Sequence, residues 1–120
     1  MNILIVVFGL FLTMVLVGCG KKDYDIHDHP KNFTGADYYM VHCSDCHKKS
    51  GIGKVLEGIP PVYNSHMTHS QMRKFIRTGV YPNAEKHRNI MPVFSKMSKK
   101  EARMITRHID ELFRERLNKR

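Results

Sequence analysis

Cysteine is scarce in this chain, which has only Cys19, Cys43 and Cys46 among its 120 residues. Because Cys43 and Cys46 are separated by two residues, no disulfide between them can cross-link distant parts of the fold. No segment alternates apolar and polar residues for long, and there is no internal repeat. The sequence therefore predicts a single small all-α domain, too short for a multidomain enzyme, whose core would benefit from a large apolar group at its centre.

Charge is missing from the first 18 residues, where an apolar run occupies positions 3–17. This run is shorter than the roughly 20 residues of a membrane-spanning helix, and it ends in LVGC, which resembles the lipobox of bacterial lipoproteins. We therefore predict a signal peptide over residues 1–18 and a lipid anchor on Cys19. The lack of a basic residue before the run, with two lysines after it, disagrees with the positive-inside rule and keeps an uncleaved anchor open.

Acidic residues are outnumbered by basic ones, 11 to 20, which gives a formal net charge of +9. Such a field attracts acidic proteins, anionic lipid and nucleic acid alike. Export argues against nucleic acid as the natural partner. We expect a membrane-anchored lipoprotein that faces the periplasm or the cell exterior.

Residues 19–33 are expected to form a flexible polar tether, because they are dense in charge and interrupted by Pro30. Side chains in this segment that could bind a divalent metal are Asp23, Asp25, His27, Asp28 and His29. In exposed linkers such clusters are usually solvated charge. The domain itself is expected to span residues 34–120.

Three main helices are predicted in this domain. The first begins at Thr34 or Gly35 and is indicated by a stripe that shares one face: Ala36, Tyr39, Met40, Cys43 and His47. The second has a capping box of Thr68 and Gln71 and ends at Gly79. The last has a capping box of Ser98 and Glu101, followed by a helical stripe: Ala102, Ile105, Ile109, Leu112 and Phe113. Residues 48–63 and 80–97 are rich in Gly, Pro or Asn and are predicted to be long loops.

The sequence C-S-D-C-H at residues 43–47 is a C-x-x-C-H motif, the attachment signature of c-type haem. On a helical turn, the thiols of Cys43 and Cys46 can reach two vinyl groups of one porphyrin, and His47 can bind its iron. Zinc and dithiol chemistry are the alternatives for a C-x-x-C pair. Zinc would need a second pair of cysteines, and a dithiol site would need a βαβ context, and neither is present.

From about residue 34 to residue 113 the chain resembles the class I c-type cytochromes. Gly35 and Tyr39 match the glycine and aromatic residue of the family's first helix, and Ile105 and Ile109 fall where its last helix crosses the first. Gly51 and Gly53 resemble its glycine-bearing loop, although Lys48 stands where many members have glycine. The resemblance implies a fold of about three main helices with long loops around one covalent haem.

The segment Pro60-Pro61-Val62 resembles the family's Pro-x-Leu. The resemblance implies that the Pro60 carbonyl accepts the Nδ1 proton of His47 and that Val62 packs on the haem. Met91-Pro92 matches the family's Met-Pro signature, so Met91 is the expected sixth iron ligand. The alternatives at that position are an open site or a histidine: His66, His69 or His87.

These features predict electron transfer by one haem that cycles between Fe(III) and Fe(II), with no catalytic acid, base or nucleophile. The protein is expected to be a membrane-tethered shuttle, or a subunit of a respiratory complex, with redox partners that present acidic docking faces. The alternative is a haem-based ligand binder, a sensor or a small catalytic subunit with an open or labile sixth position.

Overall fold

The computed structural model describes residues 25–64, 66–80 and 91–120. Its α-helices within this part are α2 (Gly35–His42), α3 (Ser44–His47), α4 (His69–Thr78) and α5 (Lys99–Asn118). Two short 3-10 turns, η2 (Val55–Glu57) and η3 (Val62–Asn64), lie in the loop between α3 and α4. The described residues form no strand, only an isolated bridge between Lys54 and Ile59. The predicted all-α class is therefore confirmed.

Side-chain caps define where the three main helices begin. Thr34 caps α2 and Thr68 caps α4, each in a capping box with the residue three positions later. Ser98 and Glu101 form the capping box of α5. These boxes satisfy backbone N–H groups that a helix start leaves without partners. At the other end of α4, Gly79 adopts the left-handed conformation and donates its N–H to the carbonyl of Phe75.

The predicted first helix is interrupted at Cys43, which ends α2 and begins α3 with φ −117°. The interruption turns the chain, so the single stripe expected on this helix does not persist. Tyr39 and Cys43 are buried, whereas Met40 is 37% exposed. Phe113 is 41% exposed and lies outside the core, where its ring stacks on Tyr63 with centroids 5.9 Å apart. Membership of a helical stripe therefore does not indicate burial at Met40 and Phe113.

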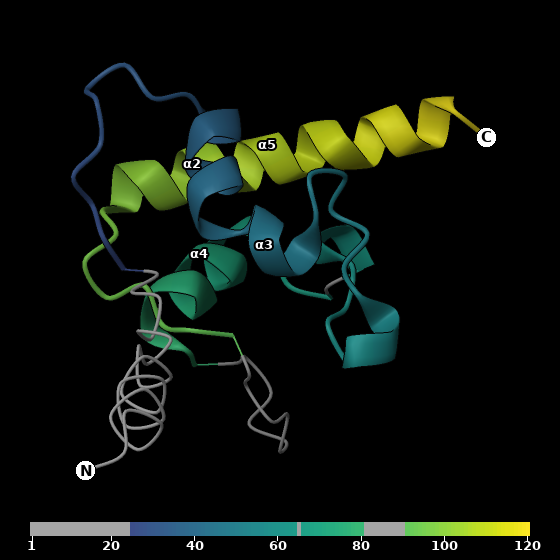
Figure 1. Cartoon of the computed structure of the whole chain (residues 1–120), viewed down its shortest axis with the longest axis horizontal. Helices are drawn as coiled ribbons and strands as arrows, with labels where there is room; N and C mark the ends of the chain where they lie inside the picture. Colours follow the sequence, from purple (N-terminus) through teal and green to yellow (C-terminus); the bar gives the residue numbers. More distant parts are fainter. Residues whose placement is uncertain (1–24, 65, 81–90) are drawn as a thin grey trace, which may run out of the picture.

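Helix α2 crosses the long helix α5 at very close range (Figure 1). A Cβ atom at Gly35 would overlap the backbone carbonyl of Met104, so only glycine permits this approach. The Tyr39 ring packs edge-on against His108, with ring centroids 5.2 Å apart. This crossing is the contact that the resemblance implies for Gly35 and Tyr39.

Helix α4 packs against α5, and the segment of residues 91–97 completes the core beside these helices. Phe94 and Met97 in that segment are each 1% exposed. The N–H of Phe94 donates to the carbonyl of Ile76, and Nε of Arg77 donates to that of Met97. The buried core consists of Tyr38, Tyr39, Cys43, Met72, Ile76, Phe94, Met97, Ala102, Ile105, Ile109 and Leu112.

The described part of the expected tether, residues 25–33, contacts the domain. The Asp25 carboxylate accepts hydrogen bonds from the Ser95 hydroxyl and the Lys96 N–H. Farther along, Nε2 of His29 lies 2.8 Å from Nε2 of the buried His42 in α2. The sequence pattern did not indicate these contacts, because charged, proline-containing segments are usually solvated.

Several predictions lie outside the described residues. They are the signal peptide over residues 1–18, the lipidated Cys19, the possible metal ligand Asp23 and the alternative iron ligand His87. Among the helices of the described part, none has the length and apolar character needed to cross a membrane.

Candidate haem-binding site

The C-x-x-C-H motif lies on α3 and the residue before it, next to α2 and below α5 in the view of Figure 1. The N–H groups of Cys46 and His47 both donate to the carbonyl of Cys43, so the three motif side chains project from a single turn. Both cysteines are free thiols. Cys43 is buried and Cys46 is partly buried, and burial raises the pKa of the Cys43 thiol to about 12.

The imidazole of His47 is oriented by the loop that follows the motif. Its Nδ1 lies 3.0 Å from the carbonyl oxygen of Pro60. A carbonyl can only accept a hydrogen bond, so Nδ1 carries the proton and Nε2 keeps its lone pair. Burial lowers the pKa of His47, and the bond to Pro60 only partly opposes this. Burial thus favours the neutral ring, and the bond to Pro60 leaves Nε2 as the available nitrogen, which is the form that binds a metal ion.

The loop from residue 48 to residue 62 is held in place by its own backbone. The N–H of Gly53 donates to the His47 carbonyl, and the N–H of Val62 donates to the Gly51 carbonyl. Gly51 and Gly53 have φ values of 72° and 71°, and a Cβ at Gly53 would overlap the backbone of residues 59 and 60. Glycine is therefore required for the loop to return to His47. Val62 is partly buried and packs against the core.

Lys48 adopts φ 60° and ψ 162°, a conformation that is favourable for glycine only. Its carbonyl accepts hydrogen bonds from the Tyr39 hydroxyl at 2.9 Å and from the Gly51 N–H at 3.1 Å. These bonds hold the residue in place. This conformation suits glycine, the residue that the resemblance to class I cytochromes implies for many members at this position.

Met91 is partly buried and packs against the core cluster, as does Met67. Two of the histidines considered as alternative iron ligands are at the surface. His66 is exposed, and the 57% exposed side chain of His69 bonds Asp110 of α5 at 2.9 Å. Among the described candidates for the sixth ligand, Met91 is therefore less exposed than either histidine, and its role as the ligand stays a prediction.

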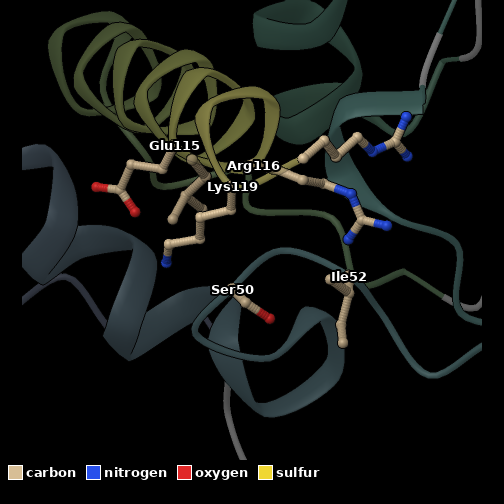
Figure 2. Close-up of a pocket in the computed structure, with 7 residues that line it drawn as sticks. Ser50, Ile52, Glu115, Arg116 and Lys119 are labelled. Carbon is tan, nitrogen blue, oxygen red and sulfur yellow. The ribbon is translucent and has the colours of Figure 1, made fainter.

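A surface hollow lies elsewhere, between the C-terminal end of α5 and the loop after α3. Figure 2 shows Glu115 and Arg116 of α5, and Lys119 directly after it, facing Ser50 and Ile52 of that loop. The Arg116 guanidinium donates to the Tyr63 hydroxyl at 2.7 Å. None of the predicted haem-binding residues lines this hollow.

The structure also brings together three histidines, of which the sequence indicated only two as possible metal ligands. His27 and His29, both considered above as metal ligands, meet the buried His42 of α2. His42 was missed because it lies far along the chain from the other two and next to the haem motif. The pattern His-x-His before the domain was the available signal, but nothing local predicts its third member.

An all-α fold with a C-x-x-C-H turn, and a histidine held by a proline carbonyl, defines a c-type cytochrome. The sequence model of the family "Cytochrome C oxidase, cbb3-type, subunit III" matches residues 31–109, more than half of the chain. The chain belongs to this family of c-type cytochromes. It therefore carries covalent haem c, and its general function is electron transfer with redox partners rather than catalysis by itself. Searches among curated proteins and among solved structures found no match.

Proposed function

We propose that this protein is a membrane-tethered, monohaem electron carrier in which Cys43 and Cys46 form the thioether bonds and His47 and Met91 are the axial ligands. The observation that carries the proposal is the hydrogen bond between Nδ1 of His47 and the Pro60 carbonyl. It leaves Nε2 as the metal-binding atom of a histidine that directly follows the two thiols.

The donor set fits haem c. Two free thiols and an oriented imidazole project from one helical turn. The thioether of Met91, on the other long loop, would be the second axial ligand. When bound, haem supplies an iron that accepts and releases one electron. The chain's own residues hold it: the Pro60 carbonyl orients His47 and increases its basicity, and Val62 gives the site an apolar wall. Met91 favours the ferrous state and excludes other ligands.

The membrane tether and the acidic redox partners in this proposal rest on the sequence. Lipidation of Cys19 after export would tether the domain to a membrane on its periplasmic or outer side. The net charge of +9 favours redox partners with acidic docking faces. The name of the matched family supports the further proposal that the domain works as a subunit of a respiratory complex.

Replacement of Met91 tests the ligand assignment. The ferric haem-loaded protein is expected to show a Met–iron charge-transfer band that disappears in Met91→Ala. The reduction potential of this variant should fall, because it loses the thioether that stabilises ferrous iron. Visible absorption and potentiometric titration measure both effects.

Met67→Ala is the matched control, because Met67 is also partly buried against the core. It should retain the band and the potential. If the band survived in Met91→Ala and vanished in Met67→Ala, the assignment of Met91 would be wrong. Rapid binding of carbon monoxide by the ferrous wild-type protein would instead favour a ligand-binding role with a labile sixth position.

A further inference from the structure

Three imidazoles meet where the segment before the domain crosses α2. They belong to His27, His29 and His42, and one ring nitrogen from each lies within 4.8 Å of the others. Nε2 of His29 and Nε2 of His42 are only 2.8 Å apart, so one nitrogen donates a hydrogen bond and the other accepts it. The rings of His27 and His42 are stacked, with centroids 4.9 Å apart. The group therefore presents three nitrogen ligands toward one small volume.

Aromatic side chains surround these imidazoles and limit their motion. Phe33 stacks on the His29 ring at 5.0 Å between centroids, and Tyr38 packs against its edge. Phe94 packs edge-on against His42, which is 5% exposed. A shell of this kind restricts solvent access to a metal site and holds its ligands in orientation.

Two carboxylates contact His27 from opposite sides of its ring. Nε2 lies 2.8 Å from Asp25 and Nδ1 lies 3.4 Å from Glu101. A metal ion bound to one nitrogen would replace the carboxylate contact of that nitrogen, and the other nitrogen would keep its carboxylate partner, which is the usual arrangement around a metal-bound histidine. The carboxylates are themselves fixed, Asp25 by Ser95 and Lys96, and Glu101 by Ser98. They also supply local negative charge in a chain whose net charge repels cations.

We propose that His27, His29 and His42 bind one divalent transition-metal ion of the class that prefers imidazole ligands, such as Zn²⁺. Two nitrogens about 2.05 Å from a tetrahedral ion are about 3.3 Å apart. The separations in this cluster bracket that value, so small rotations of the rings suffice for binding. The ion would replace the hydrogen bond between His29 and His42 and join residues 27–29 to the helix that leads into Cys43.

Calorimetric titration of the haem-loaded full-length protein with ZnCl₂ tests the site. We expect one Zn²⁺ per chain with micromolar or tighter affinity, and no competition from Mg²⁺, which prefers oxygen ligands. The double variant His27→Gln/His29→Gln should weaken binding at least tenfold. His66→Gln/His69→Gln removes the same number of histidines from the surface and should bind like the wild type.

Chemical modification gives a measurement that needs no variant. Bound Zn²⁺ should protect His27 and His29 from diethyl pyrocarbonate, as mapped by peptide mass spectrometry, while His66 and His69 stay reactive. Absence of Zn²⁺ binding would overturn the proposal. Binding that survives His27→Gln/His29→Gln but is lost in His66→Gln/His69→Gln, or a lack of protection, would also overturn it. None of these outcomes depends on the assignment of the haem ligands.

Discussion

Lys48 occupies a backbone conformation that glycine alone adopts without strain. It directly follows the haem motif, and its carbonyl is held by Tyr39 and Gly51. Strain of this kind costs about 1–3 kcal/mol and persists only where surrounding contacts enforce it. Here those contacts bring the loop back so that the Pro60 carbonyl reaches His47. The local strain is thus tied to the orientation of the proposed iron ligand.

Replacement of Lys48 by glycine should therefore stabilise the haem-loaded protein. Relief of strain exceeds the added entropy of the unfolded chain, about 0.4–1 kcal/mol, so we expect a net gain of about 1 kcal/mol in the free energy of unfolding. Urea denaturation measures it. Lys49→Gly is the control, because Lys49 has no positive φ and should only lose stability. Equal stability of the two variants would show that Lys48 is not strained.

The contacts of some residues could be predicted from the sequence, and those of others could not. The bond between His47 and Pro60 followed from the resemblance to class I cytochromes, because two short motifs carry it. The burial of His42 did not, since its partners lie 13 and 15 positions earlier in a segment with no periodicity. Long-range contacts of this kind have no local signal.

The helices were predicted well where capping chemistry marks their ends. Thr68 and Ser98 each cap a helix in the structure as the sequence indicated. Thr34 caps α2, for which the sequence indicated a start at Thr34 or Gly35. The break at Cys43 was missed, because the residues on both sides have helical spacing and no Gly or Pro interrupts them. The close crossing of α2 and α5 needed the resemblance, since Gly35 alone is also compatible with an ordinary helix start.

The capping box of α2 should make stability depend on pH. Hydrogen bonds from the hydroxyl and the N–H of Thr34 hold the pKa of Asp37 below its ordinary value. A carboxylate with a lowered folded-state pKa stabilises the protein above its unfolded pKa of about 3.9, and this stabilisation is lost as the pH falls through the folded value.

Asp37→Asn should therefore be less stable than the wild type at neutral pH, with a deficit that is constant above about pH 5 and shrinks below about pH 4. Thermal unfolding of both haem-loaded proteins across this range measures the difference. A deficit that is independent of pH would show that the charge of Asp37 has no part in the cap.

At the scale of the whole molecule, the net charge of +9 and the proposed lipid anchor determine how the protein meets its partners. A basic surface accelerates encounter with an acidic protein, and salt screens this attraction over about 10 Å at 0.1 M. The overall charge was available from composition. The docking of residues 25–33 onto the domain was not, because it depends on backbone and side-chain groups that only the folded chain brings together.

Electron transfer with an acidic redox protein should slow as ionic strength rises, because screening reduces the encounter rate. Stopped-flow absorbance of the haem reports the rate constant. Reduction by a small uncharged reductant is the control and should change little with salt. A rate that is independent of salt with the acidic protein would contradict the role of the basic surface.

The most direct test is the intact mass of the protein produced in a host that matures c-type cytochromes. We expect the mass of the polypeptide plus one covalently attached haem, and no attached haem in Cys43→Ala/Cys46→Ala. A wild-type mass equal to that of the polypeptide alone, with both Cys43 and Cys46 open to alkylation, would contradict the account.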